Sequence, residues 1–521
     1  MSSYWIDSTK NDVLDDKKID KNYTTDVCIV GAGITGLSTA YYLSKKGLKV
    51  IVVDKAPSIG EKASGNTTAK ITLGHNLIYK YLIDSFGLDF AVSYYQANMD
   101  AIANIKELID NENINCDFEY TDNYVYSTNQ DDIDKIQDEL TAIKKIEDNI
   151  NVVYDNPNES LTNEKYTCNP QFVKECELPF KIAGAIKISN QAQFHPRKYM
   201  VGLAKSIEQH DGKIFTNTLV SDVNMLSDGY VTICNEYAIK SKYVVLASHY
   251  PFINFPGFYF SKMYQVTSYA MCVETSGNIP DGMYINTGEP ALSIRKVKSN
   301  DKSMAIVAGG NHKTGYSPES NSNYAYAFLE QKVKELYPDG KILYKWNTRD
   351  CVTLDKVAYI GKFSSLMPEV YVATGFNKWG MTTSNIAANI ITDCITGSKN
   401  KYSEIYDSTR FNPIKNRAEL KNMGKQIVQS FVSSRVKIPE EDLSAIQNDN
   451  GGIIKVNGEK IGVYKDKDGK VYAVKPICTH LGCLLTWNNV DKTWDCPCHG
   501  SRFDYTGKNM YDPAFEDLEK I

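Results

Sequence analysis

Long apolar runs are missing from this chain of 521 residues, and so is an excess of basic residues. No stretch approaches the roughly 18 apolar residues that a membrane-spanning helix needs, so the sequence predicts no transmembrane helix. The formal net charge is −5, and a nucleic-acid surface would need a basic patch, so we expect no nucleic-acid partner. The first 20 residues lack the apolar core of a signal peptide, and we therefore expect a cytoplasmic protein.

Internal repeats and low-complexity segments are absent as well. Hydrophobic residues make up 42% of the chain and charged residues 23%, which is typical of a globular protein with two or three domains. Eight of the twelve cysteines are scattered singly over the first 394 residues, as expected of reduced and mostly buried thiols. The other four lie between residues 478 and 498, and this clustering indicates a site.

Residues 26–55 contain, in order, a strand, a glycine turn, a helix, a second strand and an acid. The first glycine of GAGITG permits a tight turn, the second lets backbone amides approach a pyrophosphate, and the third lets the helix pack on the strand. The acid is placed to accept hydrogen bonds from ribose hydroxyls. A glycine turn alone is a weak signal, but the whole unit predicts a dinucleotide site. The candidate binding residues are Gly31, Ala32, Gly33, Ile34, Thr35, Gly36, Asp54 and Lys55.

The loop 58–70 follows this unit and is rich in small and hydroxyl residues. Its backbone amides and the hydroxyls of Ser64, Thr67 and Thr68 are suited to donate hydrogen bonds to a bound phosphate, with Ala69 beside them. The alternative is an ordinary surface loop, because such composition is common between regular elements.

The remaining patterns indicate that a second, antiparallel domain is inserted between pieces of the nucleotide-binding part. Residues 85–150 show mostly helical spacing, and residues 264–310 indicate the alternating strands of an antiparallel sheet. Residues 1–22 are polar and predict an extended arm, while residues 448–521 have the short strand-like runs of a small β domain. Between them, residues 398–447 form a charged connector. Within the connector, one predicted helical face is apolar and carries Leu420, Met423, Ile427, Val428 and Phe431. We expect this face to pack on a neighbouring domain rather than on a membrane.

The C-terminal cysteines stand with histidines in two boxes, Cys-Thr-His-Leu-Gly-Cys at 478–483 and Cys-Pro-Cys-His-Gly-Ser at 496–501. Two cysteines and two histidines on two loops make a ligand set that tetrahedral zinc accepts. A [2Fe–2S] cluster with two cysteines on one iron and two histidines on the other accepts the same set. The candidate metal ligands are Cys478, His480, Cys496 and His499.

Both boxes closely resemble the ligand boxes of the Rieske family. By this resemblance, the two ligand cysteines hold one iron and the two histidines hold the other. Each box also has a second cysteine, Cys483 or Cys498, for which a zinc site has no use. The resemblance implies that these two form a disulfide that clamps the ligand loops.

One residue departs from the high-potential Rieske pattern, in which a serine and a tyrosine after the second box both hydrogen-bond to cluster or ligand sulfur. Ser501 is present, but Phe503 stands where the tyrosine would be. A missing donor leaves more electron density on sulfur, so we expect a redox potential below that of respiratory-chain relatives.

The glycine fingerprint fits NAD or FAD, and it occurs once, whereas a flavoprotein reductase that takes hydride from NADH usually has two. From about residue 23 to 400 the chain resembles the D-amino-acid-oxidase-like FAD oxidoreductases. Besides the dinucleotide unit and the loop 63–70, the resemblance is carried by a strand at 243–247 and by segments at 348–350, 359–361 and 373–382. In that family the last segment brings a helix N-terminus to the flavin pyrimidine ring. The further FAD-binding residues that the resemblance implies are Val220, Ala247, Gly361, Gly375, Trp379, Gly380, Met381 and Thr382.

Together the resemblances imply an α/β FAD-binding Rossmann-like domain with an interleaved antiparallel α+β substrate domain, followed by a small all-β Rieske [2Fe–2S] domain. We expect the FAD oxidoreductase at 23–400, with the substrate domain at about 85–185 and 264–345. The connector then spans 401–447 and the Rieske domain 448–521. The arrangement resembles bacterial fusions of such a flavoprotein to a Rieske domain.

The implied chemistry follows from the two cofactors, because FAD accepts two electrons as a hydride and a [2Fe–2S] cluster accepts one. The resemblance implies loss of hydride from the carbon beside a neutral amine of an amine or amino acid, with single electrons passing through the cluster. The expected partners are this small-molecule substrate and a one-electron acceptor or donor protein. The alternatives are an electron-transfer protein without an organic substrate and a reductase running in the opposite direction.

Candidates for the substrate side are few. Arg295 is suited to pair with a substrate carboxylate, or it is a solvated charge on a strand. His75 follows the flavin loop and either faces the ring or is a structural histidine. Trp379 either walls the site or packs in the core, and His195 is expected to be structural.

Overall fold

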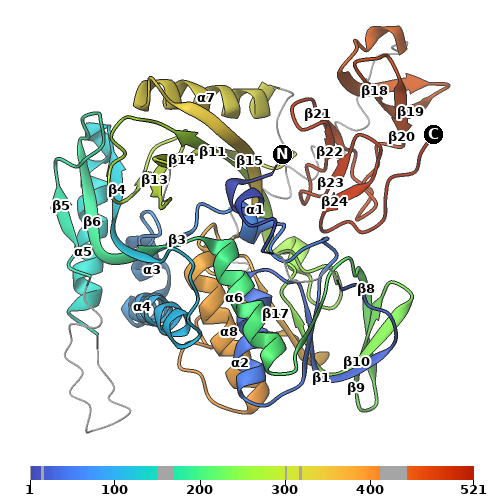
Figure 1. Cartoon of the computed structure of the whole chain (residues 1–521), viewed down its shortest axis with the longest axis horizontal. Coiled ribbons are helices and arrows are strands. Elements are labelled where there is room, and N and C mark those ends of the chain that lie inside the picture. The colour runs from blue at the N-terminus through green and yellow to red at the C-terminus, as the bar shows by residue number, and fades with distance from the viewer. Residues whose placement is uncertain (1, 13–16, 151–167, 300–301, 316–319, 411–442) are drawn as a thin grey trace.

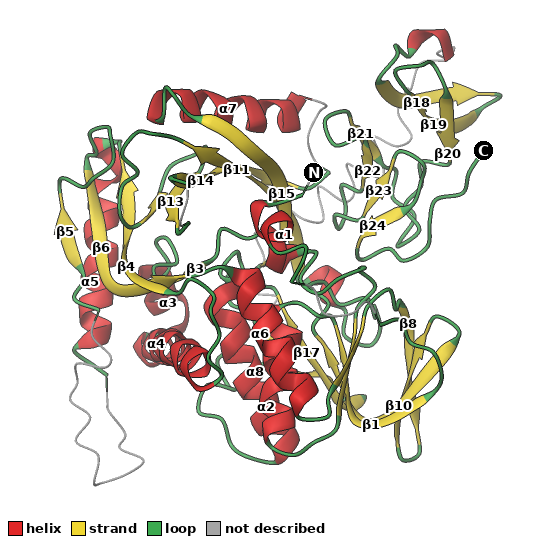
Figure 2. Cartoon of the chain, in the orientation of Figure 1, coloured by secondary structure: helices red, strands yellow, loops and turns green. Residues whose placement is uncertain are grey.

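The computed structural model describes residues 2–12, 17–150, 168–299, 302–315, 320–410 and 443–521. Two large sheets are built from interleaved parts of the chain, and a smaller pair of sheets follows at the C-terminal end (Figures 1 and 2). Among the described residues, none of the helices combines the length and the apolarity needed to cross a bilayer. The predicted apolar face of the connector lies outside the described residues; it comprises Leu420, Met423, Ile427, Val428 and Phe431.

The first sheet contains the predicted dinucleotide unit and has the strand order β16-β17-β10-β1-β2-β7. The pairings from β7 to β17 are parallel, and β16 is antiparallel at the edge. All four residues of β2 are buried, as expected of a parallel strand covered on both faces. The helices α2, α6 and α8 lie together beside this sheet (Figure 1). The bounds are β1 Tyr23–Val30, β2 Val50–Val53, β7 Lys213–Phe215, β8 Val220–Leu226, β9 Gly229–Cys234, β10 Tyr237–Leu246, β16 Tyr359–Ser364, β17 Met367–Thr374, α2 Ile34–Lys45, α6 Pro196–Gln209 and α8 Gly380–Thr396.

The second sheet has the order β15-β11-β14-β13-β12-β4-β6-β3, with β5 paired to β6. The strands predicted over 264–310 are β11 to β14, and their mutual pairings are antiparallel. The helix α7 covers β11 and β14, along the top of Figure 1. The bounds are β3 Lys70–Ile71, β4 Glu119–Ser127, β5 Gln171–Val173, β6 Gly184–Gln193, β11 Met263–Glu274, β12 Met283–Asn286, β13 Leu292–Val297, β14 Met304–Lys313, β15 Lys341–Thr353, α3 Tyr79–Phe86, α4 Leu88–Asn111, α5 Ile133–Glu147 and α7 Ser320–Leu336.

The N-terminal residues differ from the extended arm that their polar composition predicted. They contain a short helix, α1 Tyr4–Ser8, which is capped by the hydroxyl of Ser3. The side chain of Trp5 is buried, and its indole Nε1 donates a hydrogen bond to the carbonyl of Thr67 at 2.8 Å. One large aromatic residue therefore anchors the arm, because burying its apolar surface stabilises a defined position.

The C-terminal part contains two small antiparallel sheets, one of three strands and one of four. Its core contains Tyr464, Trp487, Trp494 and Phe503 together with the cysteines of both boxes. In Figure 1 this part lies at the upper right, next to β15. The bounds are β18 Asn450–Val456, β19 Glu459–Lys465, β20 Val471–Val474, β21 Thr486–Asn488, β22 Thr493–Asp495, β23 Arg502–Asp504 and β24 Asn509–Tyr511.

Candidate functional site

The turn between β1 and α2 leaves no room for a side chain at its three glycines. A Cβ at Gly31, whose φ is +112°, would lie 2.5 Å from the carbonyl oxygen of Ala247, and a Cβ at Gly36 would lie 1.8 Å from that of Gly31. A Cβ at Gly33 would lie 2.8 Å from the hydroxyl of Ser64. The open backbone stands at the N-terminus of α2, where free N–H groups and the helix dipole favour an anion.

Asp54 directly follows β2, so it lies at the same end of the sheet as the glycine turn. Its Oδ2 accepts the backbone N–H of Ala32 at 2.7 Å, and its Oδ1 accepts that of Ala56 at 2.8 Å. Burial raises the pKa of Asp54. The two amides fix the carboxylate at the mouth of the turn, which is the position that suits a ribose.

The loop after β2 is held by side chains from distant parts of the chain. It contains the 3-10 helix η1 Ala63–Asn66. Besides the bond from Trp5 to Thr67, the indole Nε1 of Trp346 donates to the carbonyl of Asn66 at 2.9 Å. Ser64, Thr67 and Thr68, from the same loop, line the cavity.

Arg295 does not line the cavity that this loop borders, which corrects the prediction that it pairs with a substrate carboxylate. Its guanidinium NH1 donates to the carbonyl of Thr68 at 2.9 Å and to that of Ala69 at 2.7 Å. The side chain is buried, and burial lowers its pKa to about 10. Arg295 therefore positions the loop, since its donors are directed to backbone carbonyls.

His75 is also placed behind the cavity wall rather than in it, which corrects the prediction that it faces the flavin ring. Its Nδ1 bonds to the hydroxyl of Tyr94 at 2.7 Å and its Nε2 to the carbonyl of Thr72 at 2.8 Å. Its ring stacks on Trp379 with 4.5 Å between centroids. Trp379 itself lines the cavity, so His75 supports the wall that Trp379 forms. Burial lowers the pKa of His75 to about 3, which keeps the ring neutral.

The turn, the loop and the second sheet enclose a cavity with about 1940 Å³ of empty space, including its open mouth. Most of the predicted cofactor-binding residues line it: Gly31, Gly33, Thr35, Asp54, Lys55, Ser64, Thr67, Thr68, Val220, Ala247, Gly375, Trp379, Gly380 and Met381. The N-terminus of α8, at Gly380, opens into the same cavity.

Six predicted cofactor-binding residues do not line the cavity: Ala32, Ile34, Gly36, Ala69, Gly361 and Thr382. Their roles in the fold explain the difference. The N–H of Ala32 bonds to Asp54, the N–H of Ile34 bonds to Ser64 Oγ at 3.1 Å, and the carbonyl of Ala69 accepts from Arg295. Gly36 packs against the turn, Gly361 pairs with β17, and Thr382 is buried in α8.

Sequence reasoning missed several polar residues that line the cavity from the second sheet and the adjoining loops. Asp350 projects from β15 and accepts a hydrogen bond from the hydroxyl of Ser268 at 3.2 Å. Lys378 also lines the cavity. His249 lines it with a φ of +70°, and its Nε2 has no hydrogen-bond partner among the described residues. The positive φ of a non-glycine residue is a structural signal for function, and the sequence does not reveal it.

The two boxes of the C-terminal part meet so that their four predicted ligands converge. The thiols of Cys478 and Cys496 hydrogen-bond to one another, which lowers the pKa of Cys478 and raises that of Cys496. The rings of His480 and His499 lie 5.1 Å apart between centroids and nearly perpendicular to each other. The structure thus brings the sulfur pair and the imidazole pair together from loops that are distant in sequence.

The donor set fits a [2Fe–2S] cluster. The Nδ1 atoms of His480 and His499 are buried without a hydrogen-bond partner among the described residues. Burial lowers the pKa of His480 to about 4 and that of His499 to about 3, so both rings are neutral, as metal ligands must be. Two thiols and two unpartnered imidazole nitrogens are the donors that a Rieske cluster requires.

A disulfide links Cys483 and Cys498, as the resemblance implied, with 2.25 Å between the sulfur atoms. The sulfur of Cys496 lies within 4.8 Å of both disulfide sulfurs, so the bridge packs directly beside the ligand loops. Ser501 is hydrogen-bonded to the sulfur of Cys478. Phe503 is fully buried nearby and has no hydroxyl to add a second such bond.

The C-terminal part also completes the cavity described above. Asp512 and Phe515 are lining residues, although both follow β24. The carboxylate of Asp512 pairs with Lys55 at 2.5 Å, and the ring of Phe515 contacts that of Phe252 with 5.4 Å between centroids. The C-terminal part therefore contributes to the wall of the cavity.

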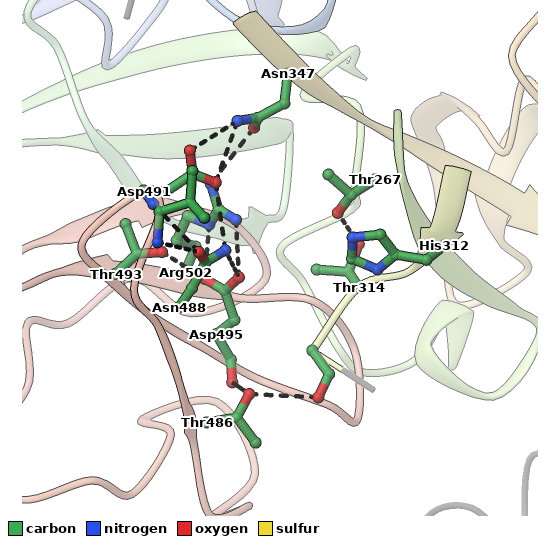
Figure 3. A network of polar contacts seen from close by, with 12 residues as sticks. Thr267, His312, Thr314, Asn347, Thr486, Asn488, Asp491, Thr493, Asp495 and Arg502 are labelled. Carbon is green, nitrogen blue, oxygen red and sulfur yellow. Dashed lines mark hydrogen bonds and ion pairs between the residues drawn. The ribbon is translucent and has the colours of Figure 1, made fainter. Parts of the chain in front are cut away.

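A buried polar network joins the second ligand loop to β15. Arg502 holds both carboxylate oxygens of Asp495, at 2.6 and 2.7 Å, and one oxygen of Asp491 at 3.1 Å. Asn347, on β15, donates to the Asp491 carboxylate at 3.1 Å (Figure 3). Because Asp495 precedes the second box and Arg502 follows it, their ion pair closes the base of that loop.

Comparisons with known proteins agree with this geometry. Residues 26–394 match the family described as FAD dependent oxidoreductase, and residues 437–521 match the Rieske [2Fe-2S] domain. The chain is 32% identical over 519 residues to the Rieske 2Fe-2S iron-sulfur protein YhfW of Bacillus subtilis (strain 168), covering 100% of this chain and 97% of that protein.

Two solved structures share the fold of the larger part. An L-amino acid deaminase from Proteus vulgaris aligns with a TM-score of 0.60 at 17% identity, over 77% of this chain and 98% of that one. A glycine oxidase from Geobacillus kaustophilus aligns with a TM-score of 0.58 at 18% identity, over 75% of this chain and 100% of that one.

Proposed function

This chain belongs to the FAD dependent oxidoreductase family and carries a C-terminal Rieske [2Fe-2S] domain, and from this premise we propose that it oxidises an amine or amino acid and delivers the electrons singly. FAD supplies hydride acceptance when bound, and the cluster supplies one-electron exchange. The observation that carries the proposal is the lining of one cavity by the dinucleotide unit, the polar face of the second sheet and the Rieske domain.

We assign the FAD contacts by the chemistry of the lining groups. The N-terminus of α2 and the hydroxyls of Ser64 and Thr67 are suited to the pyrophosphate, because all of them donate hydrogen bonds. Asp54 is suited to the ribose hydroxyls as an acceptor. The N-terminus of α8 has the positive end of its dipole toward the cavity, which suits a flavin ring that becomes anionic on reduction.

We assign the polar groups of the sheet side to the substrate. The carboxylate of Asp350 is suited to a substrate ammonium group, and the amine of Lys378 is suited to a substrate carboxylate. Both line the cavity. An L-amino acid deaminase and a glycine oxidase share this fold, and the substrates in their names support the amino-acid class.

His249 is the residue that we assign to receive the proton which a substrate ammonium must lose before hydride transfer. Burial lowers its pKa, so its ring is neutral at pH 7. His249 lines the same cavity as Asp350, and its Nε2 has no hydrogen-bond partner among the described residues. A neutral imidazole with an open nitrogen is suited to accept a proton within hydrogen-bond reach.

The proposal is tested by mixing the holoprotein without oxygen with a panel of amines and amino acids while flavin absorbance is followed. We expect at least one compound to bleach the flavin. The Asp350→Asn variant should raise the KM for that compound, whereas Asp281→Asn, on an exposed carboxylate, should leave it unchanged. Bleaching by a reduced redox protein and by none of the small molecules would instead make this chain an electron relay.

A further inference from the structure

The loop that follows β10 carries three phenylalanines beside the cluster histidines. Phe260 contacts the ring of His480 with 6.5 Å between centroids and that of His499 with 5.9 Å. Phe255 lies 5.0 Å from Phe258 and 5.9 Å from Phe260 between centroids. We call Phe255, Phe258 and Phe260 the aromatic patch.

The aromatic patch lies at the surface. Phe255 is 59% exposed and Phe258 is 47% exposed. Leu481, which follows the ligand His480 in the Rieske domain, is 40% exposed. Exposed apolar side chains near this ligand thus come from both domains.

Two features of the loop favour a binding role over incidental exposure. Phe258 has a φ of +53°, which is an unfavourable backbone conformation for a bulky residue and is retained mainly where function requires it. Asn254 Oδ1 bonds to Nε2 of His480 at 2.8 Å, so the loop is fixed to a cluster ligand. Adjacent exposed aromatic rings that are held in place in this way are typical of protein-binding surfaces.

We propose that the aromatic patch is the docking surface for a protein that carries a one-electron redox centre. This proposal rests on the proposed function, in which electrons leave the cluster singly. In the transfer, one electron leaves the cluster iron and one is gained by the partner's centre, with no bond or proton exchanged. A small apolar surface around a redox ligand suits such a partner, because electron-transfer complexes bury little area and dissociate readily.

The test uses the full-length holoprotein, with its cluster reduced by dithionite and mixed with a cytochrome c. Phe255→Ser combined with Phe258→Ser should lower the rate of cluster oxidation by about tenfold, the equivalent of about 1.4 kcal/mol of lost docking free energy. The matched control combines Tyr120→Ser with Met225→Ser, which are 56% and 61% exposed on β4 and β8, and should leave the rate unchanged. Binding of the same cytochrome, measured by surface plasmon resonance, should weaken in parallel.

Several results would overturn the proposal. Equal oxidation rates in the wild type and the patch variant would do so, as would a wild-type cluster that no redox protein oxidises. Faster oxidation by a quinone in lipid vesicles than by any redox protein would assign the patch to a membrane carrier. A melting temperature lowered by the patch substitutions alone would show that the rings pack against this chain itself. Since dithionite supplies the electrons, these outcomes do not depend on whether an amine reduces the flavin.

Discussion

Replacing Arg502 by methionine is the substitution that most directly tests how the second ligand loop is held. The side chain of Arg502 is 4% exposed, and its guanidinium makes paired bonds to Asp495 at 2.6 and 2.7 Å. Arg502→Met keeps much of the side-chain volume and removes the charge. It leaves the carboxylate of Asp495 buried without its cation, while hydrogen bonds from Asn488 and Thr493 remain.

The size of the effect follows from the pKa of Asp495. Burial alone would raise this pKa, but the charge of Arg502 outweighs burial and lowers it from 3.8 to about 2. Such a shift corresponds to about 2.5 kcal/mol of stability, and removing one partner of a buried pair typically costs about 3–5 kcal/mol. Because the folded pKa is the lower one, the stabilisation is complete above pH 3.8 and is lost as the pH falls toward 2. We therefore expect Arg502→Met to lower the free energy of unfolding by about 3 kcal/mol at pH 7.

The assay is urea unfolding of the holoprotein at pH 7, followed by the visible circular dichroism of the cluster. Adding Asp495→Asn to Arg502→Met should restore part of the loss, since the charge of Asp495 is then gone while Asp491 still lacks its cation. Lys296→Met, which breaks an exposed ion pair with Asp281, should cost less than about 1 kcal/mol. The reasoning is refuted if Arg502→Met costs no more than Lys296→Met, or if the double variant is less stable than the single one.

Three further predictions concern the cluster, the turn and the buried histidines. Phe503→Tyr should raise the midpoint potential in a redox titration by about 40 mV, the equivalent of one hydrogen bond of about 1 kcal/mol to sulfur; no rise would contradict the role given to this position. Gly36→Ala should yield protein with little bound FAD, measured by released flavin, because the added Cβ would lie 1.8 Å from the carbonyl oxygen of Gly31. His75 and His195 have their pKa lowered by burial from 6.5 to about 3, so the unfolded chain binds more protons and stability falls below pH 6.5, by up to about 2.7 kcal/mol per pH unit for the pair. Urea unfolding between pH 7 and 5 measures the total slope, and His195→Asn should lower it by up to about 1.4 kcal/mol per pH unit.

The features that sequence alone predicted are those whose chemistry is local. The glycine turn is recognisable because each glycine answers a backbone constraint within a few residues, as the close approach of Gly36 to Gly31 shows. The cysteine and histidine boxes are recognisable because a metal centre fixes both the residue types and their spacing. Both patterns led to the right fold and to the family, and they did so before any long-range contact was known.

The substrate candidates were less predictable, because a strand pattern gives the face of a side chain but not where the cavity ends. Ser293 and Arg295 lie on the same face of β13, since side chains alternate along a strand. Ser293 lines the cavity, while Arg295, two residues farther along, reaches the carbonyls of the flavin loop. Asp350 and Lys378 were missed for a related reason, because only the assembled sheet and loops show which polar side chains face inward.

The seating of the Rieske domain was the least predictable feature, because the residues that make it look like ordinary surface residues in the sequence. Three polar residues of the larger part each bond to a residue of the Rieske domain: Asn347, Asn254 and Lys55. Their three contacts approach that domain at the base of the second ligand loop, at a cluster histidine and at the cavity rim. A domain held at three such separate points cannot rotate without breaking a buried network or a ligand contact. The seating therefore fixes the Rieske domain against the larger part at the second ligand loop, at a cluster histidine and at the cavity rim.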